Sequence, residues 1–197
     1  MATEILDQIK PTGHLEITKI YKDGTKEIVY SKSNVITVGM GVTLAEMFGA
    51  PTGTSPTADI YQIPYFQLGD GGSTGLQVSG TVGLGSPLTV SEYGSSDPNF
   101  SVDVHDRWHN GAITVGEAFS ELQASQILRT GNTGVSFTIF VGDQVANGIS
   151  INEIGLFSKD PFNRQSPEAS ILCAYRFFTA LVKDSTFSLS FKWTIIF

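Results

Sequence analysis

The last eleven residues most constrain the fold, because large apolar side chains occupy every second position there. The odd positions carry Phe187, Leu189, Phe191, Trp193, Ile195 and Phe197, and the even ones Ser188, Ser190, Lys192 and Thr194, with Ile196 as the exception. Successive side chains of an extended strand point to opposite faces, so this pattern predicts a strand with one apolar face. Burying six such groups contributes on the order of ten kcal/mol before conformational entropy. We therefore expect residues 187–197 to be a central or face-covering strand of an antiparallel sheet.

The length allows one sizeable domain or two small ones, and the composition is that of a globular protein rich in strands. The chain has 197 residues, of which 41% are hydrophobic and 16% are charged. Its 21 glycines and 13 phenylalanines suit a sheet protein with tight turns and an aromatic core. We predict an N-terminal arm over residues 1–13 and a single domain over residues 14–197.

Short apolar segments recur with turn signals between them. Asp23-Gly24 lies between two candidate strands, 14–21 and 26–30, and predicts a hairpin. The spacing of apolar residues over 42–48 predicts a short helix. We predict helical structure also at 121–128, and further strands at 33–37, 60–68, 100–108, 112–119, 135–141, 149–157, 171–178 and 180–182. The segments from residue 135 to the C-terminus are expected to form a four-strand meander. Many short strands with few helices predict an antiparallel β-sandwich or a jelly-roll-like fold with one short helix, and with long surface loops at about 69–87 and 158–170.

The charge and hydropathy of the chain argue against nucleic acid and a membrane as partners. The net charge is −7, the isoelectric point is near 4.8, and the twelve Lys and Arg residues form no run, so nucleic acid is not expected as a partner. The N-terminus lacks the apolar core of a secretory signal, and no segment approaches the ~18 apolar residues of a membrane span. Cys173 lies in an apolar run and is expected to be a small core residue.

Motifs that resemble reactive sites fail on geometry. Asp103, His105 and His109 would share one face of a strand, but the two histidines would stand roughly 13 Å apart, too far for one metal ion. The glycine-rich segment 69–75 lacks the Gly-Lys-Ser/Thr end of a phosphate-binding loop and the context of a nucleophile elbow. Asp70 and Asp143 lack the acidic spacing of a calcium-binding EF-hand. We predict no catalytic residue, no metal and no cofactor, and hence no enzyme.

The segment Asn152-Glu-Ile-Gly-Leu-Phe157 combines core positions with one acidic residue. Ile154 and Leu156 are expected in the core, whereas Glu153 lies among apolar residues. Two interpretations stay open for Glu153. It either faces solvent beside Ile154 or pairs with Arg176 or Lys192 on a neighbouring strand and fixes the register.

Four segments together resemble a known class of proteins. They are Asn34-Val-Ile-Thr37 followed by a glycine-rich helix start, Tyr65-Phe-Gln-Leu-Gly-Asp-Gly71, the segment 152–157, and Phe191-Lys-Trp-Thr-Ile-Ile-Phe197. In this order they resemble a group of tailed-bacteriophage virion proteins that includes tail-fibre and collar-fibre attachment modules and baseplate components. The resemblance covers most of the chain and is densest after Val135. Because the sequence stops at Phe197 without a coiled coil, shaft or tip, it favours a compact adaptor, baseplate or neck component.

The resemblance implies a structural function in the virion, in a protein made in the host cytoplasm. Such a protein would form a homo-oligomer and contact other virion proteins of the tail, baseplate, fibre or neck, with no membrane or nucleic acid as partner. Residues 1–13, 69–87 and 158–170 are the candidate contacts. Two alternatives stay open: a capsid-decoration or head–tail connector protein, and a carbohydrate-binding β-sandwich in which Trp108 and Tyr93 form a stacking surface.

Overall fold

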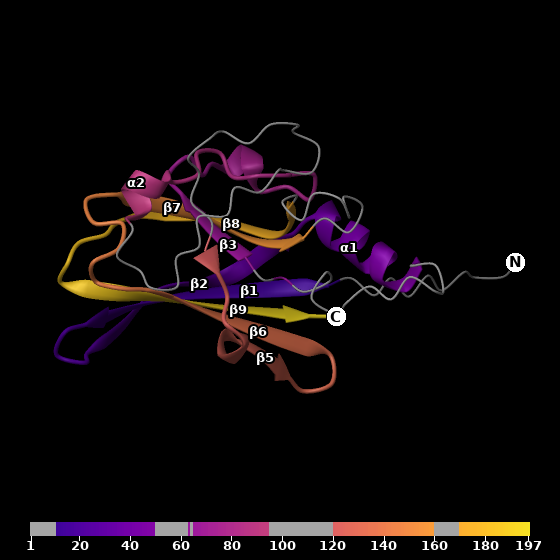
Figure 1. Ribbon diagram of the computed structural model, residues 1–197, viewed down its shortest axis with the longest axis horizontal. Coiled ribbons are helices and arrows are strands. Elements are labelled where there is room, and N and C mark those ends of the chain that lie inside the picture. Colours follow the sequence, from indigo (N-terminus) through magenta and orange to yellow (C-terminus); the bar gives the residue numbers. More distant parts are fainter. Residues whose placement is uncertain (1–10, 50–62, 64, 95–119, 160–169) are drawn as a thin grey trace, which may run out of the picture.

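The computed structural model describes residues 11–49, 63, 65–94, 120–159 and 170–197 (Figure 1). The strands are β1 (Thr12–Tyr21), β2 (Lys26–Ile36), β3 (Tyr65–Gly69), β4 (Ser120–Glu121), β5 (Ile127–Thr130), β6 (Gly134–Val141), β7 (Ser150–Lys159), β8 (Ser170–Val182) and β9 (Phe187–Ile196). The helices are α1 (Val38–Gly49), α2 (Val90–Tyr93) and the 3₁₀ turns η2 (Thr74–Leu76) and η3 (Ala124–Gln126). The expected strands at 100–108 and 112–119 and the first residues of the expected arm lie outside the described residues.

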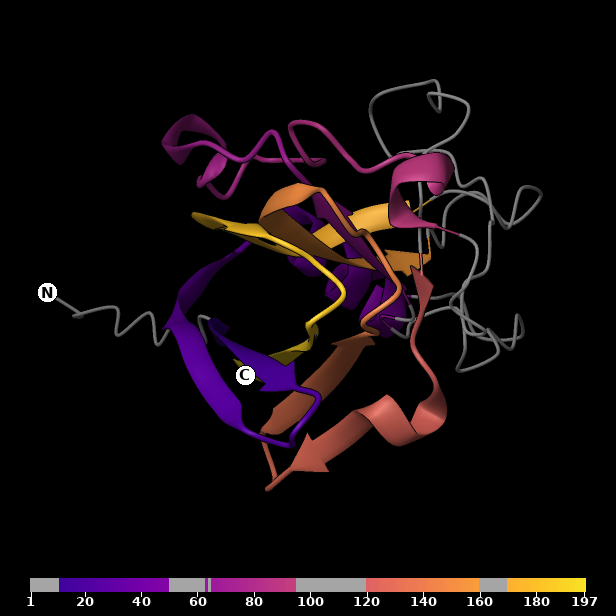
Figure 2. The same cartoon turned by 90° about the vertical axis from the view of Figure 1, so that its left-hand side faces the viewer.

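The strands form one curled antiparallel sheet, a half-barrel, in the order β4-β3-β7-β8-β2-β1-β9-β6-β5 (Figures 1 and 2). The two-residue β4 adds an edge to eight longer strands. The prediction of a mostly β fold with a short helix is confirmed, but the prediction of a two-sheet sandwich or jelly roll is wrong. The reason is β2, which pairs with β1 from Lys26 to Asn34 and then with β8 through Val35 and Ile36. One strand thus belongs to both halves and makes them continuous.

The predicted hairpin is confirmed, and its turn shows why Asp-Gly suits it. Gly24 has a φ of +86°, a left-handed conformation that glycine adopts without steric cost. Asp23 accepts a hydrogen bond from the amide of Thr25 at 2.8 Å through its Oδ1 atom. The second strand runs further than expected, because residues 33–36 continue β2 instead of forming a separate strand.

The C-terminal strand is central, as predicted. β9 lies between β1 and β6 and pairs with both along nearly its whole length. Its residues Phe187, Leu189, Phe191, Trp193 and Ile195 are buried in the main core, together with Ile154 and Leu156 of β7. Phe197 follows the end of the strand and is 38% exposed, so the predicted apolar face ends at Ile195.

The predicted helix is confirmed and begins earlier, at Val38. It packs against β8, and Gly39 lies so close to the carbonyl of Leu172 that a side chain there would collide with the strand. Thr43 donates to the carbonyl of Gly39 at 3.0 Å or shares a hydrogen bond with Ser158 at 2.9 Å. These contacts fix α1 over the end of the sheet (Figure 1).

Two local predictions are wrong. The last four strands do not form a meander, because β6 pairs with β9 on the far side of β1 and β2 from β7 and β8. Residues 121–128 are not one helix but the end of β4, the single turn η3 and the start of β5. This segment carries the chain from one edge of the sheet to the other, since β4 and β5 are the two edge strands.

Candidate functional site

The side chain of Glu153 is the centre of the most connected polar cluster among the described residues. It is fully buried, and both carboxylate oxygens are occupied. Oε1 accepts hydrogen bonds from the backbone amides of Ser86 at 2.9 Å and Gly71 at 3.2 Å. Oε2 accepts one from the amide of Gly85 at 3.0 Å and one from the hydroxyl of Tyr175 at 2.9 Å. Four donors converging on one carboxylate satisfy a buried charge that would otherwise be costly.

The loop 70–87 lies over β7 because glycines allow a close approach. A side chain on Gly69 or Gly72 would collide with Glu153, and one on Gly71 or Gly85 with the backbone of the opposite loop arm. Asn152 adds a second attachment, accepting from the amide of Gly72 at 2.8 Å and donating to its carbonyl at 3.2 Å. The expected free surface excursion is therefore a strap that is attached to the sheet.

Apolar packing beneath the strap closes the cluster. Leu84 of the strap joins Tyr65, Phe157, Leu172 and Tyr175 in a second small core on the outer side of β3, β7 and β8. Burial raises the pKa of the Tyr175 hydroxyl strongly, and the neighbouring charge of Glu153 raises it further. Tyr175 therefore stays protonated and keeps donating to Glu153 through the neutral range.

The glycine-rich segment does form an anion cradle, but the protein's own carboxylate fills it. The amides of Gly71, Gly85 and Ser86 point at one place, as amides do in phosphate-binding loops. Glu153 occupies that place, so no free anion can bind there without displacing it. Sequence reasoning found both the loop and the acidic residue but could not pair them, because nothing in the pattern relates a strand residue to backbone amides about 70–80 positions away.

The predicted register partners of Glu153 are placed elsewhere. Glu153 lies opposite Phe177, and Arg176 lies opposite Ile154, so Arg176 points to the other face of the sheet. The guanidinium of Arg176 donates instead to the hydroxyl of Tyr30. Lys192 is exposed on β9, opposite Glu16 of β1 and Thr138 of β6. Neither interpretation of Glu153 describes what the structure shows, because the residue is buried and bonded to the strap.

A second polar cluster surrounds Lys183, which sequence reasoning did not single out. Its ammonium group is buried and donates to the carbonyls of Asp184 at 2.7 Å and Asp143 at 3.3 Å and to Oδ1 of Asn147 at 3.1 Å. It also lies 5.3 Å from the centre of the Phe187 ring. Burial lowers the pKa of Lys183, while the carboxylates of Asp143 and Asp184 act in the opposite direction. Lys183 joins the β6–β7 loop to the β8–β9 turn.

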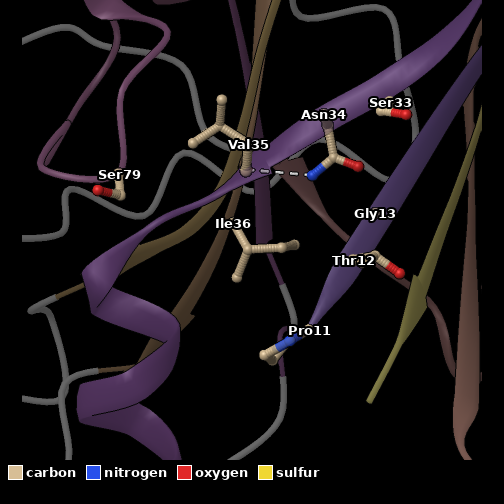
Figure 3. Close-up of a pocket in the computed structure, with 8 residues that line it drawn as sticks. All are labelled: Pro11, Thr12, Gly13, Ser33, Asn34, Val35, Ile36 and Ser79. Carbon is tan, nitrogen blue, oxygen red and sulfur yellow. Dashed lines mark hydrogen bonds between the residues drawn. The ribbon is translucent and has the colours of Figure 1, made fainter. Parts of the chain in front are cut away.

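A shallow cavity of about 340 Å³ opens at the start of β1 and the end of β2 (Figure 3). The described residues that line it are Pro11, Thr12, Gly13, Ser33, Asn34, Val35, Ile36 and Ser79. Asn34 donates to the carbonyl of Val35 at 3.1 Å and covers Gly13, whose missing side chain leaves it room (Figure 3). This lining holds no ionisable side chain, so these residues offer no acid, base or charged metal ligand.

One broad face of the sheet carries no described α-helix (Figures 1 and 2). We call the outward side chains of β2, β1, β9 and β6, except Ser136 of β6, the uncovered face; they are exposed or partly exposed, whereas Ser136 is buried. Small hydroxyl residues dominate it, and the apolar exceptions include Ile28, 62% exposed, and Phe140, 51% exposed. Its members are Thr12, His14, Glu16, Thr18, Ile20, Lys26, Ile28, Ser31, Ser33, Thr138, Phe140, Ser188, Ser190, Lys192, Thr194 and Ile196.

The remaining sequence candidates do not assemble into a reactive site in the described part of the chain. Cys173 is buried, and burial raises the pKa of its thiol. Within the described ranges, no three His, Cys, Asp or Glu side chains are grouped so that they could hold a metal ion. Asp103, His105 and His109 lie outside those ranges. None of the described helices has the length and apolar character needed to span a membrane.

Comparison with protein-family models, curated proteins and solved structures gives no match for this chain.

Proposed function

We propose that this chain is a structural, non-enzymatic component of a tailed-bacteriophage virion. In this proposal it is made in the host cytoplasm and is incorporated at the baseplate or at a fibre attachment, where it associates with copies of itself and docks other virion proteins. The observation that carries the proposal is that the segments behind the resemblance all serve the scaffold. None of their described polar side chains is left presenting a reactive group at a cavity.

Each of those segments has a definite structural task. Residues 34–37 carry β2 from one half of the sheet to the other and into α1. Residues 65–71 and 152–157 form the paired strands β3 and β7, joined to the strap by Glu153. Residues 191–197 complete the central strand β9. A rigid sheet with attached loops is the kind of framework on which assembly surfaces are built.

The uncovered face supports an assembly function. It spans four neighbouring strands and exposes large apolar side chains among hydroxyl groups, whereas most other large apolar side chains of the described sheet are buried. Ile28, Phe140 and Ile196 lie on three different strands of this face, and a contact with another protein would cover them. An acidic chain with such a face is kept soluble by its net charge of −7 until it meets its partner.

The alternatives differ in what supports them. A capsid-decoration or head–tail connector function would use the same scaffold and differs from a tail function in location and copy number. The carbohydrate-binding alternative requires exposed aromatic rings for stacking, but Tyr93 is only 2% exposed and Trp108 lies outside the described residues. Tyr93 therefore gives this alternative no support.

Labelling of intact particles tests the proposal. Phage particles that encode this chain would be incubated with gold-conjugated antibody raised against the purified protein and viewed by electron microscopy. We expect label at the tail end or fibre attachment in isolated particles. Label spread over the capsid would favour decoration, label at the neck would favour a connector, and particles that remain unlabelled after disassembly would refute a function in the virion.

A further inference from the structure

We infer that the uncovered face is the contact between two copies of this chain, packed sheet against sheet and related by a two-fold axis. The axis lies in the gap between the two sheets, runs parallel to the strands, and passes midway between the positions of β1 and β9. The inference rests on the assembly function proposed above and names its surface and partner. It follows from how charged and apolar residues are arranged across the four strands.

Strand pairing places the key residues in two rows across the face. One row runs from Thr138 on β6 through Lys192 on β9 and Glu16 on β1 to Ser31 on β2. The next row runs from Phe140 through Ser190 and Thr18 to Ile28. Each row is therefore known from backbone register alone.

Under one particular rotation, the two rows of one copy are complementary to the same two rows of a second copy. Turning a second copy by 180° about the stated axis brings β9 over β1 and β6 over β2. Lys192 then faces Glu16 of the second copy, and Phe140 faces Ile28 of the second copy. Because the axis is two-fold, each of these contacts occurs twice.

Charge disfavours the competing rotation. An axis in the same plane but perpendicular to the strands would place β1 over β1 and β9 over β9. Where that axis crosses the row of Glu16 and Lys192, each of them faces its own copy, and like charges brought together cost several kcal/mol. Where it crosses elsewhere, neither residue faces an opposite charge of the second copy. Within one chain, Glu16 and Lys192 are opposite each other on adjacent strands, yet neither forms an ion pair with a described residue. Both charges are therefore available to a partner.

Distances and area suit a modest interface. Packed sheets lie about 10 Å apart, a gap that a glutamate and a lysine reaching from opposite sides can close. Four strands about 4.8 Å apart and about 26 Å long cover at most roughly 500 Å² per copy, because the face is the outer side of a curled sheet and its outer strands β2 and β6 curve away from a packed copy (Figure 2). The total of at most roughly 1,000 Å² lies at the low end of specific interfaces, so we expect a weak dimer that multiple contacts in a larger assembly would reinforce.

Charge reversal followed by sedimentation tests this arrangement. The full-length chain would be measured from about 1 µM to about 500 µM, because an interface of this size binds in the micromolar range or more weakly. We expect a concentration-dependent dimer whose dissociation constant rises about tenfold or more in Glu16→Lys and in Lys192→Glu, and returns to within about threefold of the original in the double variant. Phe140→Ser should also raise it, whereas Val182→Ser, at a residue of similar exposure (63%) away from the face, should not.

Net charge is controlled by design. Lys32→Glu makes the same charge change as Lys192→Glu on the opposite side of β2 and should leave the dimer intact. Glu16→Lys changes the net charge from −7 to −5, which by itself would favour association, so weakening there identifies a specific contact.

Cross-linking tests the axis. Chains carrying Ile28→Cys and chains carrying Phe140→Cys, mixed and treated with a bis-maleimide that spans about 10 Å, should form a cross-linked heterodimer, because facing sheets lie about 10 Å apart, too far for a direct disulfide. Each variant alone should link poorly, because its two copies would be offset by three strand spacings, about 14 Å, across the gap. Efficient linking of Phe140→Cys with itself would overturn the stated axis. A chain that stays monomeric over the whole concentration range, or whose face is protected in particles only by a different protein, would overturn the inference. Particle labelling separates the two proposals: a labelled particle with a monomeric chain refutes only this interface, and a dimer in unlabelled particles refutes only the function in the virion.

Discussion

Replacing Glu153 by glutamine tests whether one buried carboxylate holds the strap in place. The substitution preserves shape but turns one acceptor oxygen into an NH₂ donor. The hydroxyl of Tyr175 can rotate and accept from this group, whereas the backbone amide of Gly85, which shares Oε2 with it, cannot. The favoured orientation therefore sets the new NH₂ group against the amide of Gly85. The substitution therefore leaves one particular group, the backbone amide of Gly85, without its hydrogen-bond acceptor.

The magnitude follows from the bonds involved. A hydrogen bond to a charged partner contributes about 1.5–3 kcal/mol, and a buried donor left unpaired costs about 1–3 kcal/mol. Relief of the buried charge offsets part of this loss. We expect Glu153→Gln to lower the free energy of unfolding by about 2–4 kcal/mol and Glu153→Ala by about 3–5 kcal/mol. With a urea m-value of about 2 kcal/mol/M, the glutamine variant should unfold at a urea concentration lower by about 1–2 M.

Two measurements and one matched control decide the matter. Equilibrium urea unfolding followed by circular dichroism gives the free energy, and amide hydrogen exchange should show faster exchange at Gly85, by about thirtyfold or more if the strap opens locally. Glu27→Gln is the control, because Glu27 also accepts from a tyrosine hydroxyl, that of Tyr21 at 2.7 Å, but at an exposed position. It should change stability by no more than about 0.5 kcal/mol. If Glu153→Gln behaves like the control, the carboxylate does not hold the strap.

Three further predictions concern other parts of the scaffold. Lys183→Met should lower the free energy of unfolding by about 1–3 kcal/mol because the three hydrogen bonds of its buried ammonium group are lost. Lys32→Met, at an exposed lysine, should be nearly neutral, and thermal unfolding compares the two variants. Deleting Trp193–Phe197 should abolish soluble folding because β1 and β6 lose the second half of their shared partner, including the buried Trp193 and Ile195. A monodisperse truncated chain with native circular dichroism would show that this part of β9 is peripheral. The stability that Tyr175 contributes should be complete below about pH 10 and decline above it, because the pKa of its hydroxyl is raised on folding. The difference in unfolding free energy between the natural chain and Tyr175→Phe should therefore shrink as the pH rises from about 9 to about 11.5. A difference that stays constant over this range would contradict the prediction.

Local patterns in the sequence predict the strands better than they predict the sheet. The alternation over 187–197 and the Asp23-Gly24 turn identify β9 and the β1–β2 hairpin, because both depend on neighbouring residues only. The single curled sheet depends on β2 changing partner at Val35, which no periodicity records. The expected meander failed for the same reason, since short connections favour neighbouring strands but do not require them.

Buried polar groups were the least predictable features. The sequence identifies Glu153 as unusual and suggests Arg176 or Lys192 as its partner, whereas its partners in the structure are mainly backbone amides. Lys183 lies beside Asp184 in what looks like an ordinary polar turn, and only its burial under the β6–β7 loop distinguishes it. In both cases the main partners are backbone groups of a distant loop. Because almost every residue type has the same backbone donor and acceptor, the sequence does not show which of them will bind a given side chain.

The copy number of this chain in purified particles tests the central claim most directly. Isotope-dilution mass spectrometry, with labelled peptides from this chain and from a protein of known copy number in the particle, would count it. The account predicts a small fixed number of copies per particle, as expected of rings or fibre attachments, that stays constant through density-gradient purification. A count that falls toward zero as the particles are purified would contradict it.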